Sequence, residues 1–214
     1  MVELNGYRFV PEQNLGTASA SRGARWRQEA LGGSLNGQRN ALVQLAKLPT
    51  MRELELLKTA GITLVDYVGG NAYYALLDES LKPPSLGRGN RITSIVALRP
   101  EWKLGGALQP VNGKEAIGAI PDYARAGTDG AKVVIRYAPN ASTPQILKAL
   151  QELGLRDIEV AAPFRAVYAE MPLAAASRVT ALPWVLAVGL YPPPPTLYNN
   201  QGRIIGRASV LGSP

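Results

Sequence analysis

The residue types that most enzymes use for nucleophilic, acid–base or metal chemistry are missing from this sequence. It contains no cysteine and no histidine. Disulfides, thiolate chemistry and Cys/His zinc sites are therefore excluded, as is a Ser-His-Asp triad, because no side chain can act as the imidazole base. No spacing of lysines or carboxylates indicates another catalytic base, and no glycine-rich loop has the arrangement that cradles phosphate. We therefore expect a protein that is not an enzyme, with no metal site and no cofactor.

Arginines give the chain a basic character. There are 23 Lys+Arg against 16 Asp+Glu, for a formal net charge of +7. The densest basic patch holds Arg22, Arg25 and Arg27, with Arg39 nearby. Such a patch fits an anionic partner (nucleic acid, a lipid surface or an acidic protein) or a solvated surface on a flexible arm. We favour the second interpretation, because the arginines lie among Gly, Ala and Ser without interleaved aromatic residues.

The positions of the tyrosines argue against a nucleic-acid partner. Sheets that bind RNA carry aromatic residues two apart on a central strand. Tyr73 and Tyr74 are adjacent and point to opposite faces of a strand, and only Tyr168 falls in the corresponding strand of the second half. We therefore predict no nucleic-acid binding. We also predict no membrane span, because no apolar stretch approaches the roughly 20 residues that one needs.

One order of patterns occurs twice along the chain: strand, helix, strand, strand, helix or irregular piece, strand. In residues 41–103 the expected strands are 42–46, 62–68, 72–77 and 93–99, with a helix over 50–60. In residues 132–191 they are 132–138, 158–161, 166–171 and 184–190, with helices over 143–153 and 172–182. This order predicts an α+β fold of two tandem ferredoxin-like (βαββαβ) units, each an antiparallel sheet with its helices on one face.

Local signals place the ends of the helices. Thr50 and Glu53 have the spacing of a capping box, and Met51, Leu54, Leu57 and Ala60 are expected to form an apolar stripe. Thr143 is the expected cap of the corresponding helix in the second unit, with Pro144 at its first position. Gly61 and Gly154 suit the left-handed residue that ends each helix.

Three segments lie outside the repeat. Residues 1–40 are expected to be an irregular arm with a short strand over 7–10, and residues 104–131 a linker. Residues 192–214 are expected to be a polyproline spacer and an extended tail, with a segment suited to docking in a groove as an added strand or to leading into a further domain.

Aligning the two units at Gly61 and Gly154 predicts which side chains face the helices. Tyr74 and Leu76 then correspond to Val167 and Ala169 in the core. Tyr73 and Ala75 correspond to Ala166 and Tyr168 on an open face. We predict Tyr168 first and Tyr73 second as partner-contact residues. The alternative is that these tyrosines pack between the two units.

Several short motifs resemble a known family. They are Leu-Val-Gln-Leu from Leu42, Ala-Gly-Ile from Ala60, Asp-Tyr-Val from Asp66, Asn-Ala-Tyr from Asn71, Pro-Glu-Trp-Lys-Leu from Pro100 and, in the tail, the stretch 199–212. In this order they resemble the long N-terminal propeptides of secreted bacterial subtilisin-like serine proteases. The resemblance covers residues 42 to the end. The usual family has one such unit, whereas this chain is predicted to have two.

The resemblance implies a role without catalysis in this chain. It implies an intramolecular chaperone and inhibitor whose sheet face docks on a subtilisin-like protease domain, in cis or in trans, while the tail lies in the active-site cleft. The implied contacts are Tyr73, Tyr168 and the tail residues Arg207, Ala208, Ser209, Val210 and Leu211. A secreted or periplasmic location is also implied, although residues 1–6 lack the pattern of a signal peptide. The alternative is a non-catalytic protein-binding or ligand-sensing scaffold.

Overall fold

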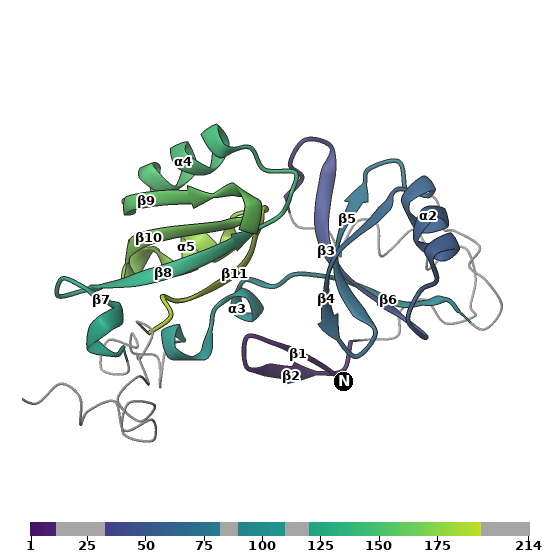
Figure 1. Ribbon diagram of the computed structural model, residues 1–214, viewed down its shortest axis with the longest axis horizontal. Helices are drawn as coiled ribbons and strands as arrows, with labels where there is room; N and C mark the ends of the chain where they lie inside the picture. Colours follow the sequence, from purple (N-terminus) through teal and green to yellow (C-terminus); the bar gives the residue numbers. More distant parts are fainter. Residues whose placement is uncertain (12–32, 82–89, 110–119, 194–214) are drawn as a thin grey trace, which may run out of the picture.

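A computed structural model describes residues 1–11, 33–81, 90–109 and 120–193. Its two main sheets are both antiparallel, with α2, α3, α4 and α5 as the α-helices of the described residues, so the chain is an α+β protein. Figure 1 shows the two sheets beside each other, with a small N-terminal hairpin between them. Strands outnumber helices, as the many short β-branched and alternating segments predict.

The first sheet contains β3 (Gln38–Leu45), β4 (Ile62–Gly69), β5 (Ala72–Asp78) and β6 (Ile92–Ala97) in the spatial order β4-β5-β3-β6. Helix α2 (Met51–Thr59) packs Leu57 into the cluster formed with Val43, Ile62 and Ala75. Gly61 follows the helix with φ 86°, which confirms the predicted left-handed end.

The second sheet contains β8 (Gly130–Tyr137), β9 (Arg156–Ala161), β10 (Ala166–Pro172) and β11 (Val185–Leu190) in the order β11-β8-β10-β9. A short strand, β7 (Arg125–Ala126), pairs with β8. If the short β7 is left aside and the four strands of each sheet are numbered along the chain, both sheets have the same spatial order: second, third, first, fourth.

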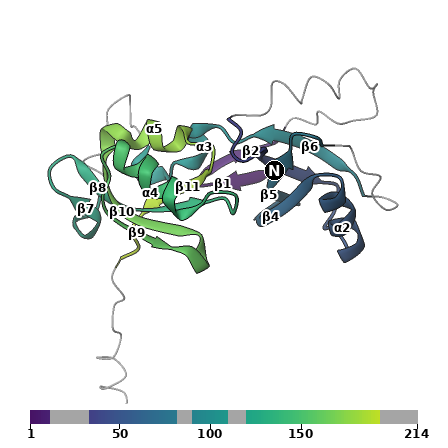
Figure 2. The ribbon, with the colours of Figure 1, turned by 90° about the horizontal axis from the view of Figure 1, so that it is seen from above.

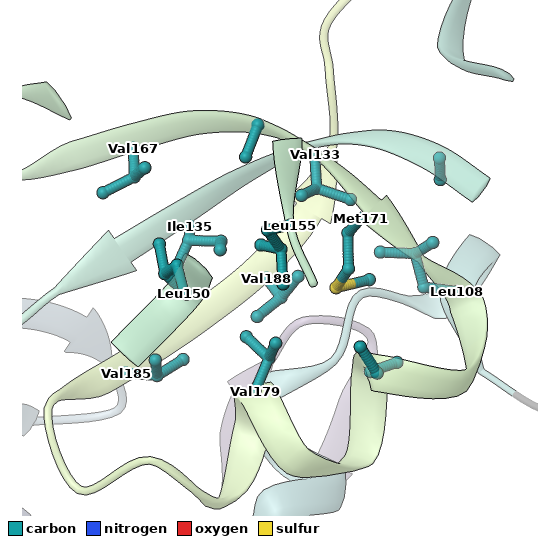
Figure 3. Packing of buried hydrophobic residues seen from close by; sticks show 14 of the residues in the cluster. Leu108, Val133, Ile135, Leu150, Leu155, Val167, Met171, Val179, Val185 and Val188 are labelled. Atoms are coloured by element: carbon teal, nitrogen blue, oxygen red, sulfur yellow. The ribbon is translucent and has the colours of Figure 1, made fainter. Parts of the chain in front are cut away.

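Both helices of the second half pack on the same side of its sheet (Figure 2). They are α4 (Thr143–Glu152) and α5 (Ala176–Ala181), the latter preceded by the 3₁₀ turn η5 (Leu173–Ala175). Figure 3 shows this core, in which aliphatic side chains from the two helices meet those of the strands. Its buried members include Val133, Ile135, Ile146, Leu150, Val167, Met171 and Val179.

The segment predicted as a linker belongs in part to the second core. Leu104, Leu108, Ile120 and Ala124 are all buried in its main cluster. Leu104 directly follows the short helix α3 (Pro100–Lys103), and Leu108 ends the 3₁₀ turn η1 (Gly106–Leu108). Ile120 precedes the 3₁₀ turn η3 (Asp122–Ala124), which contains Ala124. The prediction was wrong for the described residues because scattered Gly and Pro hid isolated apolar residues, which gain burial only from a sheet distant in sequence.

The first eleven residues are also more ordered than predicted. β1 (Val2–Leu4) and β2 (Tyr7–Phe9) form an antiparallel hairpin, which confirms the expected strand near residue 7 and contradicts an irregular arm in this part. Val2 and Leu4 are buried against the first sheet. The basic patch at Arg22, Arg25 and Arg27 lies outside the described residues.

The capping box at α2 is confirmed, but the predicted apolar stripe is only partly right. Glu53 accepts hydrogen bonds from the Thr50 amide (2.8 Å) and from Asn90 Nδ2 (3.1 Å). The Thr50 backbone bond, followed by the Asn90 bond, holds the pKa of Glu53 below its usual range. Glu53 is therefore buried beside Leu57, whereas Met51 is 75% exposed.

The N-cap of helix α4 is one residue earlier than predicted. Ser142, not Thr143, is the N-cap, and its amide donates to Gln145 Oε1 at 3.0 Å; Pro144 is then the second helical residue. We expect Ser142→Ala to lower the free energy of unfolding by about 1 kcal/mol, because it removes a capping oxygen. Thr143→Ala is the matched control and should change it by less than about 0.5 kcal/mol. Urea denaturation of the three proteins measures both values, and a larger loss from Thr143→Ala would contradict the assignment.

Candidate functional site: the open face of the second sheet

Both faces of the first sheet are covered. One face packs against α2 through the cluster that includes Leu57 and Ala75. The other face packs against the N-terminal hairpin and against residues of the second half, in a cluster that contains Leu42, Leu76 and Leu186. In the described part of the first unit, no sheet face is therefore left open for a partner.

Tyr73 consequently does not lie where the sequence alignment placed it. Tyr73 and Ala75 belong to the face that packs on α2, and Tyr74 and Leu76 to the opposite face, so both assignments for this unit were wrong. Tyr73 pairs across the sheet with Val43, whereas its true equivalent, Val167, pairs with Ile135. The second hairpin holds one more residue between Gly154 and that position, and an offset of one residue exchanges the two faces of a strand.

Trp102 anchors the N-terminal hairpin at the junction of the two units. Its ring stacks on Phe9 with centroids 4.2 Å apart, and Arg99 lies over it at 5.1 Å. Its carbonyl oxygen accepts a hydrogen bond from Asn5 Nδ2 at 2.7 Å. The buried Tyr74 lies in the same junction, and burial raises its pKa to about 12. The tyrosine between the units is thus Tyr74, so the alternative that Tyr73 and Tyr168 pack there was wrong.

An ion cluster also joins the two units. Asp66 on β4 is 2.6 Å from Arg165 and 3.2 Å from Arg136, both of the second unit. Arg165 follows the 3₁₀ turn η4 (Ala162–Phe164) and adopts the left-handed conformation, with φ 48°. The cluster is partly exposed, mainly at Arg136, so its contribution to stability is modest although its geometry is specific.

We expect Asp66→Asn to lower the free energy of unfolding by about 1 kcal/mol, because it leaves two arginines without their shared carboxylate. Added salt should reduce the difference from wild type, since the lost interaction is partly exposed. Asp122→Asn, which removes a more exposed pair with Arg125, is the control. Urea denaturation at two salt concentrations measures the effect. A loss that does not change with salt would assign it to packing instead.

The second sheet has one face that no helix covers. Tyr168 lies on this face, as predicted, while Val167 and Ala169 point into the helix-covered core. Opposite Tyr168 are Glu159 on β9 and Val134 on β8, and Val134 is in turn opposite Gly189 on β11. A side-chain atom added at Gly189 would meet nothing within 4 Å, so the surface beside this row is open.

The next row along the same face is charged. Glu170 lies directly opposite Lys132, and the amide of Tyr191 donates to the Lys132 carbonyl oxygen at 2.8 Å. The Tyr191 ring packs against Tyr168 with centroids 5.4 Å apart and the planes inclined by 59°. We call the surface formed by Lys132, Val134, Glu159, Tyr168, Glu170 and Tyr191 the Tyr168 face.

A concavity of about 450 Å³ lies on this face. Tyr123, Tyr168 and Tyr191 supply its aromatic wall, and it also contains Lys132, Asp157, Glu159, Glu170 and Pro192. The sequence prediction named only Tyr168 among these residues. The available signal was the alternation of Val167, Ala169 and Met171 with Tyr168 and Glu170, which marks a strand with one core face and one solvent face.

The chain leaves the second unit at the edge of this concavity. Tyr191 is 42% exposed and is followed by Pro192 and Pro193, where the described residues end. The predicted tail contacts Arg207, Ala208, Ser209, Val210 and Leu211 lie outside the described residues. The tail therefore begins beside Tyr168.

Within the described ranges, no group of three acidic residues has a geometry suited to holding a metal ion. The helices of those ranges are all too short or too polar to cross a bilayer. The geometry of the Tyr168 face, with aromatic rings, unpaired charges and no candidate nucleophile–base pair, suits recognition of another molecule more than catalysis.

Comparisons with known proteins give one match. Residues 3–99 match a family described as a domain of unknown function (DUF8729). The match covers the N-terminal hairpin and the first sheet, and it ends before α3. Searches of curated proteins and of solved structures found no significant match.

Proposed function

We propose that this chain is the propeptide of a subtilisin-like serine protease and acts as its intramolecular chaperone and inhibitor. In this proposal the chain is two tandem ferredoxin-like units. The Tyr168 face docks on the protease domain, and the residues after Pro193 lie in its active-site cleft. The protein is then secreted or periplasmic.

The observation that carries the proposal is the position of the open face relative to the tail. Among the described residues, the second unit has the only main-sheet face that no other element covers, because the first sheet is covered on both sides. The chain leaves that face at Tyr191. A docked sheet would thus hold the start of the tail against the partner, and a tethered segment binds at high effective concentration.

Three further points support the proposal. The common strand order of the two sheets and the placement of α4 and α5 on one side agree with a ferredoxin-like arrangement. The sequence contains no histidine, which agrees with a role in which the partner protease supplies the catalytic triad. The motif resemblance supplies the identity of the partner. The packing on both faces of the first sheet favours the second unit as the one that docks.

The test is inhibition in trans. The purified chain is added to a purified bacterial subtilisin and, if the reading frame beyond residue 214 encodes one, to its own protease domain. We expect inhibition at micromolar chain concentrations and a higher refolding yield of the denatured protease. No inhibition and no gain in refolding of the chain's own protease domain would overturn the proposal, as would a reading frame without such a domain.

The second candidate function is a scaffold that binds a protein partner without inhibiting a protease. The rigid junction favours it, because Trp102, Asp66 and the buried Tyr74 fix the two units relative to each other. Recovery of a stable complex with a non-protease partner, together with failure of the inhibition assay, would favour this candidate.

A further inference from the structure

The concavity on the Tyr168 face combines aromatic rings with an excess of negative charge. Three carboxylates, Asp157, Glu159 and Glu170, line it with one cation, Lys132, while Arg156 lies opposite Glu170 on β9 at its edge. This is the reverse of the chain as a whole, whose formal net charge is +7. Local negative charge attracts cations even on a protein whose net charge is positive.

The carboxylates lack partners in the part of the chain that the structure describes. None of the three makes an ion pair or a side-chain hydrogen bond there. Glu170 has Lys132 opposite it on β8 and Arg156 opposite it on β9, and it pairs with neither. Asp66, by contrast, is a paired carboxylate, because it binds the guanidinium groups of Arg136 and Arg165. The carboxylates of the concavity are available for a cation from outside.

The aromatic wall is suited to the same ligand. Tyr168 and Tyr191 are inclined by 59° with centroids 5.4 Å apart, and Tyr123 is 41% exposed beside them. A cation within about 6 Å of a tyrosine ring is attracted by its π-electrons, and several rings at an angle can contact one cation together. Val134 and Gly189 leave the floor of the sheet free of competing polar groups.

We propose that this concavity binds the guanidinium group of an arginine presented by a protein partner. Guanidinium is planar, stacks on aromatic rings and donates hydrogen bonds in a fork that matches a carboxylate, so it fits this set of groups better than an ammonium group. Glu159 and Glu170 accept its hydrogen bonds and the tyrosines contact its plane. The inference rests on the proposed function only for the identity of the partner: the arginine then lies on the protease surface that the sheet covers.

The test uses the full chain and a small probe. Arginine with an acetylated amino group and an amidated carboxyl group is titrated into the isotope-labelled chain at low salt, and two-dimensional NMR follows the shifts. The control probe is citrulline with the same two blocking groups, which has nearly the same shape and no charge. We expect saturable shifts at Glu159, Tyr168 and Tyr191 with a Kd on the order of 1–10 mM for arginine, and at least about ten-fold weaker binding of citrulline.

Two variants should change the affinity in opposite directions. Glu159→Gln should weaken binding of the arginine probe about five-fold, and Lys132→Gln should strengthen it about two- to three-fold, since each removes one charge beside the same ring. Glu152→Gln on α4, on the other side of the sheet, is the matched control and should leave the affinity unchanged. A loss of structure could explain a decrease but not an increase.

Equal binding of arginine and citrulline would overturn the inference, as would shifts elsewhere or no shift at tens of millimolar. Shifts seen only in a variant that lacks Arg203 and Arg207 would assign the site to the chain's own tail and overturn the claim for a partner. The probe binds or fails to bind without any protease present. Its result is therefore separate from the inhibition assay, which alone tests the proposed function.

Discussion

Lys103→Met should raise the free energy of unfolding by about 2 kcal/mol at pH 7, one of the two largest effects that the structure predicts for a single substitution. The Lys103 side chain is buried, with 4% of its surface exposed, where α3 packs against α5 and β11. Its Nζ donates to the carbonyl oxygen of Leu182 at 3.1 Å and has no carboxylate partner in the described part of the chain. A buried cation without a counter-ion opposes folding.

The direction of the pH dependence follows from the pKa. Burial lowers the pKa of Lys103 from 10.5 to about 8 in the folded protein. Between these two values the unfolded chain binds more protons than the folded one, so stability rises with pH across this window. Below pH 8 the lysine is charged in both states, and the full cost of its burial, about 3 kcal/mol, is present.

Methionine removes the buried charge but also the hydrogen bond to Leu182, which is worth about 1 kcal/mol, and this leaves the net gain of about 2 kcal/mol near neutral pH. The gain should shrink to less than about 0.5 kcal/mol by pH 9.5, because most of the burial cost is lost once the folded lysine is neutral. Higher pH is avoided because Tyr74, with its pKa raised to about 12, begins to lower the stability of both proteins once unfolded tyrosines ionise above pH 10.

Urea denaturation at pH 7 and pH 9.5 checks both parts of this prediction. The matched control is Lys148→Met, at a side chain that is 80% exposed on α4, and it should have little effect at either pH. The same gain from Lys103→Met at both pH values would show that the lysine is not a buried charge in solution.

The strands and helices of this chain could be predicted from sequence because their signals are local. The alternation along β5 and β10, the capping box at Thr50 and the left-handed glycines after α2 and α4 all involve residues close together in the chain. The structure moves the ends of these elements by only a few residues. Only the finer assignment of a tandem ferredoxin-like fold stays a proposal.

The surface could not be predicted in the same way, because it depends on contacts between distant segments. Nothing near Tyr73 in the sequence indicates that the hairpin at residues 2–9 covers the face of the first sheet opposite α2. Nor does it indicate that one extra residue in the second hairpin shifts the alignment of the two units, so that the two faces of the strand are exchanged. Lys103 looks like a solvated lysine until α5 and β11 surround it. Tyr168 was placed correctly because its own strand alternates regularly and no helix or strand among the described residues covers it.

Tyr168→Ala should raise the inhibition constant of the chain against its protease by about 30-fold, the loss of about 2 kcal/mol typical of a central aromatic contact in an interface. This expectation rests on the proposed function. Tyr168 lies in the middle of the only uncovered main-sheet face of the described residues and packs against Tyr191, next to the start of the tail. Truncation removes the aromatic contact surface and the packing partner of Tyr191, the residue after which the tail begins.

Tyr73→Ala separates the two tyrosines that the sequence singled out. Tyr73 faces α2 and contacts Tyr67, away from the Tyr168 face, so its loss should change the inhibition constant by less than about three-fold. Tyr168→Phe should keep most of the inhibition, because the Tyr168 hydroxyl makes no hydrogen bond among the described residues and the ring supplies the contact.

Steady-state inhibition assays on the three variants, each checked for wild-type-like NMR spectra, give the comparison. Equal losses from Tyr73→Ala and Tyr168→Ala would indicate a general effect on folding, whereas no loss from Tyr168→Ala would move the docking surface to another part of the chain. The difference between the two alanine variants is therefore the most direct measure of whether the open face of the second sheet is the surface that meets the partner.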